Sequence, residues 1–141
     1  MVSKLSDFAI QFRAVLDTHS SSIGLPHFYN FPRNCCEGVS VYFAFYTMQM
    51  FPSVNVEVVH SRNSDDEHHY WVEIDGLIFD LTADQFDECN APIIAQASSP
   101  LENVFPICER SFASIAMCAY DAIDDEQKEL VYKSIRIILN I

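Results

Sequence analysis

The sequence is poor in basic residues and has no long apolar run. Eight lysines and arginines stand against 20 aspartates and glutamates, which gives a formal net charge of −12. Nucleic-acid phosphates and anionic membrane surfaces both attract patches of Lys and Arg, so we expect neither as a partner. No apolar stretch approaches the roughly 20 residues that span a bilayer, so we expect no membrane insertion.

Paired cysteine motifs are also missing. The chain has no CxxC pair, and the adjacent Cys35 and Cys36 are poorly spaced for zinc. His19, His27 and His60 are scattered along the chain without ligand partners. We therefore expect no metal and no other cofactor.

The cysteines are odd in number, and the N-terminal segment lacks the apolar region and the small-residue cleavage site of a signal peptide. Free thiols are typical of a reducing compartment, so we expect a cytoplasmic protein. A secretion route that removes no signal would leave no trace in this sequence.

Glycine and proline are scarce as well, with 3 and 6 of the 141 residues, which argues against a low-complexity or fibrous chain. Half of the residues are hydrophobic and 13% are aromatic, so the chain can bury a sizeable core. This length suits a single domain, which we place over residues 1–141.

Three segments have helical patterns. Apolar residues recur at helical spacing over residues 4–17, and a loop rich in Ser, Gly and Pro follows to Asn34. Residues 36–50 are apolar on nearly all sides, which predicts a buried central helix ended by Pro52. A second amphipathic pattern covers residues 126–141 and follows two aspartates, which suit a helix N-terminus.

The middle of the chain predicts strands. Residues 54–60 alternate apolar and polar, and a polar loop follows over residues 61–67. Residues 69–74 and 77–82 flank Asp75-Gly76, and a DG pair between such runs is a strong hairpin signal. Residues 92–95 form a further short candidate strand. Helices around a central antiparallel sheet indicate an α+β domain.

The hairpin makes a geometric prediction. If the DG pair supplies the two loop residues, Trp71 faces Asp80 and His69 faces Thr82, so all four side chains lie on one face of the sheet. His69 and Asp80 are then diagonal neighbours, about 7–8 Å apart at the backbone, within reach of an imidazole–carboxylate hydrogen bond. A one-residue bulge would break this parity.

Cys36, His69 and Asp80 together predict nucleophilic catalysis by a thiol. A thiolate at the start of a helix is favoured by the helix dipole and by an adjacent imidazolium. His69 would act as the general base, and Asp80 would orient its ring and fix its tautomer.

Each of these residues also has a structural interpretation. Most free cysteines are packing residues, and His69 could simply end a polar loop. Asp80 could be a solvated strand carboxylate, although its apolar neighbours suggest a buried position, where a charge needs a partner. We favour catalysis because of the hairpin geometry, with Cys35 as the second choice of nucleophile.

An oxyanion hole is the remaining requirement of such a site. The backbone N–H of Cys36 is the first candidate donor, since it lies at a helix start. Asn34 or Gln85 could supply a side-chain amide, but Gln85 could equally be a structural partner of the hairpin.

Two strings in the chain resemble a known family. The segment 31–40 runs FPRNCCEGVS, and residues 69–86 run HYWVEIDGLIFDLTADQF. They are similar to the nucleophile segment and to the "H-x-W-V-E-x-D-G … D-x-T-x-x-Q-F" segment of small bacterial transglutaminase-like, papain-fold cysteine proteins. The resemblance covers about residues 25–105 and aligns Cys36 with the nucleophile. It implies a papain-like fold in which the nucleophile helix packs on an antiparallel sheet.

The resemblance also implies thiol acyl transfer through a thioester, acting on an amide of a protein or peptide. Hydrolysis, deamidation and transglutamination stay open, because the sequence does not show whether water or an amine reaches the thioester. A protease and a deamidase or transglutaminase effector or toxin are therefore alternatives. A catalytically idle binding domain and a small acidic adaptor or inhibitor are the non-enzymatic alternatives.

Overall fold

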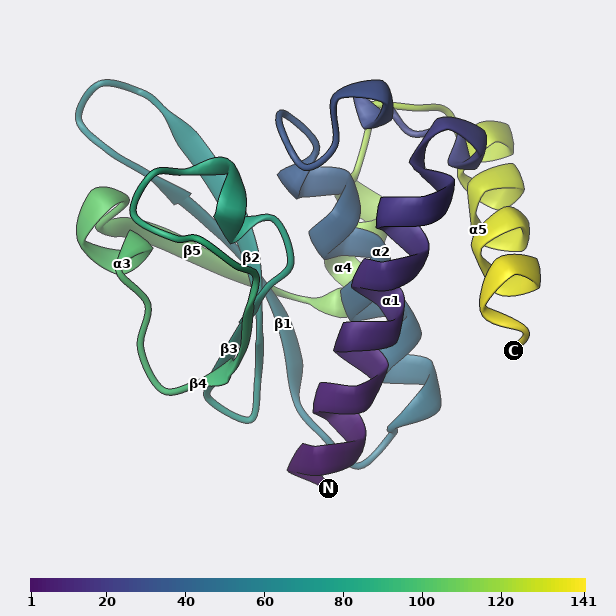
Figure 1. Cartoon of the computed structure of the whole chain (residues 1–141), viewed down its shortest axis with the longest axis horizontal. Coiled ribbons are helices and arrows are strands. Elements are labelled where there is room, and N and C mark those ends of the chain that lie inside the picture. Colours follow the sequence, from purple (N-terminus) through teal and green to yellow (C-terminus); the bar gives the residue numbers. More distant parts are fainter.

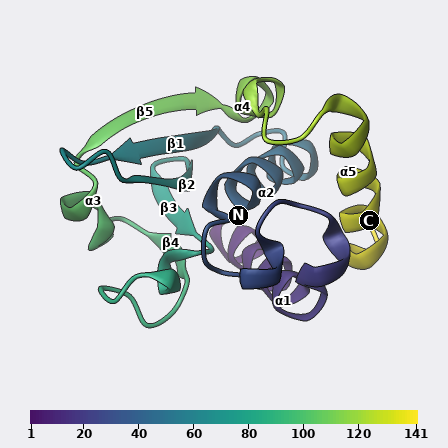
Figure 2. The same cartoon turned by 90° about the horizontal axis from the view of Figure 1, so that it is seen from above.

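The computed structural model describes all 141 residues and contains one antiparallel sheet of five strands in the order β4-β3-β2-β1-β5. The strands are β1 (Val56–Arg62), β2 (His68–Ile74), β3 (Leu77–Asp80), β4 (Ile93–Gln96) and β5 (Ile107–Phe112). The helices are α1 (Val2–Ile23), α2 (Cys36–Met50), α3 (Leu101–Val104), α4 (Ala113–Ala119) and α5 (Asp125–Leu139). In Figures 1 and 2, α1, α2 and α5 lie together to one side of the sheet. The α+β class predicted from the sequence is confirmed.

Helix α2 has the bounds that the sequence predicts, residues 36–50. It is buried on nearly all sides because α1, α5 and the sheet surround it. Phe43 is its central packing residue: its ring lies 5.8 Å from Phe8, 5.5 Å from Phe12 and 6.0 Å from Phe79 of β3. The start of α2 is thereby fixed relative to the sheet.

Helix α1 is longer than predicted. The serines of residues 20–22 continue the helix rather than forming a loop, because Ile23 beyond them is buried in the core. The helix ends at Gly24, whose φ of 85° is the left-handed conformation that glycine adopts readily.

The predicted hairpin is confirmed. Asp75 and Gly76 have φ of 49° and 83°, the pair of positive values that a type I′ turn requires. The register pairs Val72 with Phe79 and Glu73 with Ile78, as the two-residue loop demands. Strand β3 ends at Asp80, two residues earlier than predicted, because the Thr82 N–H turns back to the Asp80 carboxylate.

The other predicted strands shift by one or two residues, to Val56–Arg62 and Ile93–Gln96. Strand β5 and helices α3 and α4 were not predicted. Strand β5 lies at the sheet edge and has no buried residue, so it lacks the apolar alternation that marks a half-buried strand.

Two apolar cores cover the two faces of the sheet. The larger one joins α1, α2 and α5 to Val58, Val72 and Phe79. On the opposite face, two small clusters together form the smaller core: one of Val59, Trp71 and Ile78, and one of Ala83, Leu101 and Phe105 with Phe86. That smaller core surrounds the side chain of His69.

Helix α5 closes the helical side of the larger core. Asp124 caps its first turn by accepting a hydrogen bond from the Gln127 N–H at 2.8 Å. Tyr46 of α2 stacks on Tyr132 of α5 at 5.0 Å between ring centroids. A bilayer-spanning length of apolar sequence is not found in any of the helices.

The packing of α5 predicts different effects for two isoleucines of the same helix. Ile135 is 1% exposed and Ile137 is 78% exposed. Ile135→Ala is expected to lower the free energy of unfolding by about 2–5 kcal/mol, since it leaves a cavity. Ile137→Ala, the matched control, should change it by less than about 0.5 kcal/mol. Urea unfolding followed by circular dichroism measures both; equal effects would show that α5 does not dock as described.

Candidate active site

His69 and Asp80 form a buried pair on adjacent strands. Asp80 Oδ2 lies 2.7 Å from His69 Nε2, and the two side chains are 0% and 1% exposed. The other carboxylate oxygen of Asp80 accepts the Thr82 N–H at 3.2 Å. The two residues lie on the same face of the hairpin, where the two-residue DG loop places them.

Aromatic rings enclose the imidazole of His69. Phe86 meets it edge-on at 4.8 Å between ring centroids, with Phe105 at 5.6 Å and Trp71 at 5.9 Å. These rings exclude water from the pair, which strengthens its electrostatic interaction.

Burial opposes a charge on His69, but the neighbouring groups outweigh it. The Asp80 carboxylate acts by charge and by hydrogen bonding, Cys36 adds to it, and together they raise the pKa of His69 to about 9. At neutral pH the ring is therefore an imidazolium held on a carboxylate.

Cys36 is the first residue of α2 and is half-buried. Cys36 acts on His69 by charge and hydrogen bonding and raises the pKa of the ring, while His69 Nδ1 has no hydrogen-bond partner. Nδ1 is thus the position where the imidazole can exchange a proton with the thiol. As the first residue of a helix, Cys36 also has a backbone N–H without an intrahelical partner.

Cys35 differs sharply from its neighbour. Its side chain is 4% exposed and belongs to the larger core. Burial, with a smaller effect of Cys36, raises the pKa of the Cys35 thiol to about 12. A thiol that stays protonated is a poor nucleophile, so Cys35 has a packing role.

Asn34 and Gln85 meet in a bridge between two loops. The Asn34 N–H donates to Gln85 Oε1 at 3.4 Å, and Gln85 Nε2 donates to the Thr82 carbonyl at 3.1 Å. Gln85 therefore joins the turn after Asp80 to the loop before Cys36. The side chain of Asn34 is exposed.

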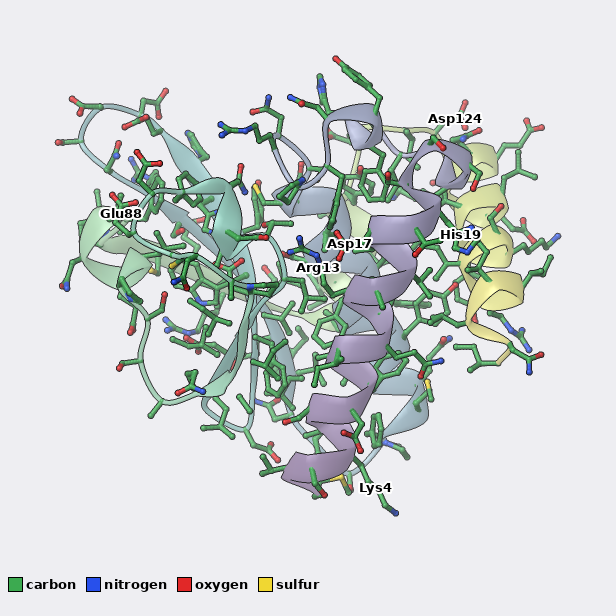
Figure 3. All side chains as sticks on the ribbon, viewed as in Figure 1. Lys4, Arg13, Asp17, His19, Glu88 and Asp124 are labelled. Atoms are coloured by element: carbon green, nitrogen blue, oxygen red, sulfur yellow. The ribbon has the colours of Figure 1, made fainter.

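Arg13 is a site residue that the sequence analysis missed. It reaches from α1 toward the sheet (Figure 3) and makes two 2.8 Å hydrogen bonds to Asp84 and one of 2.6 Å to the Leu81 carbonyl. Its guanidinium also lies 4.8 Å from the centre of the Phe31 ring. Arg13 thus fixes the segment that follows Asp80. Its partners are about 70 positions away, and no local pattern indicates them.

No group of three or more His, Cys, Asp or Glu side chains is arranged to hold a metal ion. Comparison with family models, curated proteins and solved structures found no match to this chain. The transglutaminase-like resemblance therefore stays a hypothesis that depends on the residues described above.

The different surroundings of the thiols predict selective alkylation. Iodoacetamide at pH 7 is expected to modify Cys36 faster than the exposed Cys118 and to leave Cys35 unmodified in the folded protein. His69→Ala should slow the labelling of Cys36 but not of Cys118, the internal control. Peptide mapping by mass spectrometry gives the rates. Equal rates at Cys36 and Cys118 would contradict an activated thiol.

The raised pKa of His69 predicts a pH dependence of stability. Protonated His69 favours the folded state, so this stabilisation is complete below about pH 6.5 and is lost as the pH rises through about 9. In Asp80→Asn, burial without the carboxylate no longer raises the pKa, so this loss should disappear from that window. Urea unfolding between pH 6 and pH 9.5 compares the two slopes, and equal slopes would show that the pair does not carry the effect.

Proposed function

We propose that this chain is a thiol acyl-transfer enzyme in which Cys36 attacks a carboxamide, His69 moves the protons and Asp80 orients His69. The observation that carries the proposal is the buried His69–Asp80 contact of 2.7 Å, which leaves the other ring nitrogen without a partner. Cys36, at the start of α2, adds to the raised pKa of that ring. A buried charged pair of this kind does little for stability compared with apolar packing, which favours a functional reason for it.

The proposed reaction has two halves. The Cys36 thiolate attacks the carbonyl carbon, and the oxygen takes up negative charge near the backbone N–H of Cys36. The C–N bond then breaks, and the His69 imidazolium gives its proton to the leaving nitrogen, which departs as ammonia or an amine. In the second half, water or an amine attacks the thioester while His69 takes a proton, which releases an acid or a new amide and restores the Cys36 thiolate and the His69 imidazolium.

The family hypothesis agrees with this chemistry. A papain-like or transglutaminase-like fold requires a nucleophile at the start of a helix packed on an antiparallel sheet. Here Cys36 begins α2, and Phe43 of α2 packs against Phe79 of the sheet. We therefore propose a papain-like arrangement, with a protein or peptide as substrate and with deamidation or transglutamination, as in an effector or toxin, as the alternative to proteolysis.

The roles assigned to the triad predict the effects of substitution. Cys36→Ala and Cys36→Ser should abolish turnover, because no other residue replaces the thiol. Asp80→Asn should leave a weak activity, lower by roughly 10²- to 10⁴-fold, since the imidazole persists without its orienting charge. Cys35→Ala should retain most activity. The measurements are ammonia or amine release from glutamine-containing peptides and intact-mass detection of the acyl-enzyme.

Two outcomes would decide against this assignment. An active Cys36→Ala with an inactive Cys35→Ala would move the nucleophile by one residue. Full activity of both variants would exclude a thiol mechanism. A wild-type protein without any acyl-enzyme would favour the idle binding domain.

A further inference from the structure

Two histidines join β1 to β2 on the face of the sheet opposite to the side chain of His69. His60 Nε2 lies 2.7 Å from His68 Nδ1, and the β1–β2 register places the two residues diagonally across the strands. A contact of this length between ring nitrogens is a hydrogen bond, which requires a proton on one nitrogen and a lone pair on the other. We call His60 and His68 the histidine pair.

The loop between the two strands extends this contact into a chain of hydrogen bonds. Asn63 Oδ1 accepts two backbone N–H groups of the loop, both at 3.0 Å, which fixes the turn. Asp66, with a φ of 59°, then lies with its Oδ1 3.0 Å from His68 Nε2. Because a carboxylate only accepts, His68 Nε2 carries a proton, and the neutral ring offers its Nδ1 lone pair to the His60 N–H.

The hydrogen bond limits how many protons the histidine pair can hold. With both rings neutral, His60 donates to His68. One further proton, on either ring, still leaves a donor and a lone pair between the two rings. A second further proton turns both facing nitrogens into donors and brings two positive charges into contact. The hydrogen bond therefore persists until both rings are protonated.

The surroundings of the histidine pair oppose the second positive charge. Burial first, and then His68, lower the pKa of His60, while Glu109 opposes this effect and Arg62 adds to it. Arg62 is also the register partner of His68, which faces Asp66 on its other side. The further titratable groups that face His60 come from β2, α2 and the segment after α4; they are Tyr70, Glu37 and Tyr120. Double protonation is therefore expected only in acid.

The histidine pair lies beside the backbone of His69. Ser61 is the register partner of His69, and its buried hydroxyl donates to the His69 carbonyl at 2.8 Å. A single register pair, Arg62 with His68, separates this bond from the loop. Without the hydrogen bond of the histidine pair, the loop end of β1 and β2 loses its side-chain link, and strand ends with few links open most readily. Opening there displaces the backbone that carries the His69 ring.

We propose that the histidine pair is an acid-sensitive link: it holds the loop end of β1 and β2 together while at most one of its rings is protonated, and it lets the strands separate there when both are. The separation moves His69 away from its working position, so the site is inactive in acid. The link is a property of the two strands, and only its effect on turnover rests on the proposed function.

NMR of the imidazole nitrogens tests the link directly, with His60→Gln and His68→Asn assigning the signals. We expect the pair to take up its two protons in steps at least about one pH unit apart, since coupled groups titrate in macroscopic steps. The shared N–H should persist between the steps and disappear after the second. His19, exposed on α1, is the internal reference and should take up its proton in one step. Independent single steps at positions 60 and 68 would overturn the proposal.

Two substitutions of His60 separate the hydrogen bond from the charge. The amide of His60→Gln can donate to His68 or accept from it but takes up no proton, whereas His60→Ala has no such bond at any pH. Amide exchange protection at residues 61 and 69 should fall about 10-fold or more in the wild type between pH 7 and pH 4.5, the factor of one lost hydrogen bond.

Protection at these two residues should stay high in His60→Gln and be low already at pH 7 in His60→Ala. Val72 and Phe79, paired near the DG turn, report any general loosening of the sheet. An equal fall in the wild type and His60→Gln contradicts the proposal, as does a wild type that does not change.

Turnover measurements separate this inference from the proposed function. The ratio of kcat of the wild type to kcat of His60→Gln should fall from pH 7 to pH 4.5, because effects of pH on Cys36 are common to both proteins and cancel. An acid-sensitive link without any acyl-enzyme would refute the proposed function and keep the link. An acyl-enzyme with a constant ratio and constant protection would refute the link alone. A constant ratio while protection falls at residue 69 would overturn the control of the site.

Discussion

The contact between His69 and Asp80 is the constraint on which the candidate site depends. Each group would be costly to bury alone, and removing one partner of a buried charged pair typically costs about 3–5 kcal/mol. Here the 2.7 Å contact pairs the two charges, the Thr82 N–H donates to the second carboxylate oxygen, and three aromatic rings enclose the imidazole. The rest of the smaller core is arranged around this pair.

Arg13 of α1 links the segment that follows Asp80 to the helical side of the molecule. Strand β3 ends at Asp80, so the carboxylate lies where the regular sheet stops. The chain continues through Leu81 and Asp84, both held by Arg13, and through Gln85, which bonds to the loop before Cys36. Helix α1, far from the hairpin in sequence, thereby fixes the end of β3 and the approach to the nucleophile. The geometry of the site is a property of the tertiary structure, not of the hairpin alone.

The parts of the site that were predicted from the sequence depend on short-range rules. A DG turn of two residues sets the parity of the hairpin, and parity puts His69 and Asp80 on one face. The nearly continuous apolar run after Cys36 sets α2. The features that the sequence did not predict have long-range causes. The burial of Ile23 extends α1 beyond its serines. Strand β5 is an exposed edge strand that pairs with a strand about 50 residues earlier. The ion pair of Arg13 with Asp84 spans 71 positions, so no local pattern reports it.

The alternation of side chains also explains why adjacent residues at the candidate site have different surroundings. Successive residues of β2 point to opposite faces, so His69 joins the aromatic cluster around Asp80 while Tyr70 stacks on His60 on the other face. Successive residues at the start of α2 likewise diverge, since each helical position turns by about 100°. Cys35 enters the core, Cys36 acts on the pKa of His69, and Glu37 lines a small cavity together with Tyr70 and Tyr120. Three consecutive residues thus have three different surroundings, so a shift of one position in either element would separate the proposed catalytic groups. The turn of Asp75-Gly76 and the packing of Phe43 prevent that shift, which makes these two features as necessary to the proposed chemistry as the thiol itself.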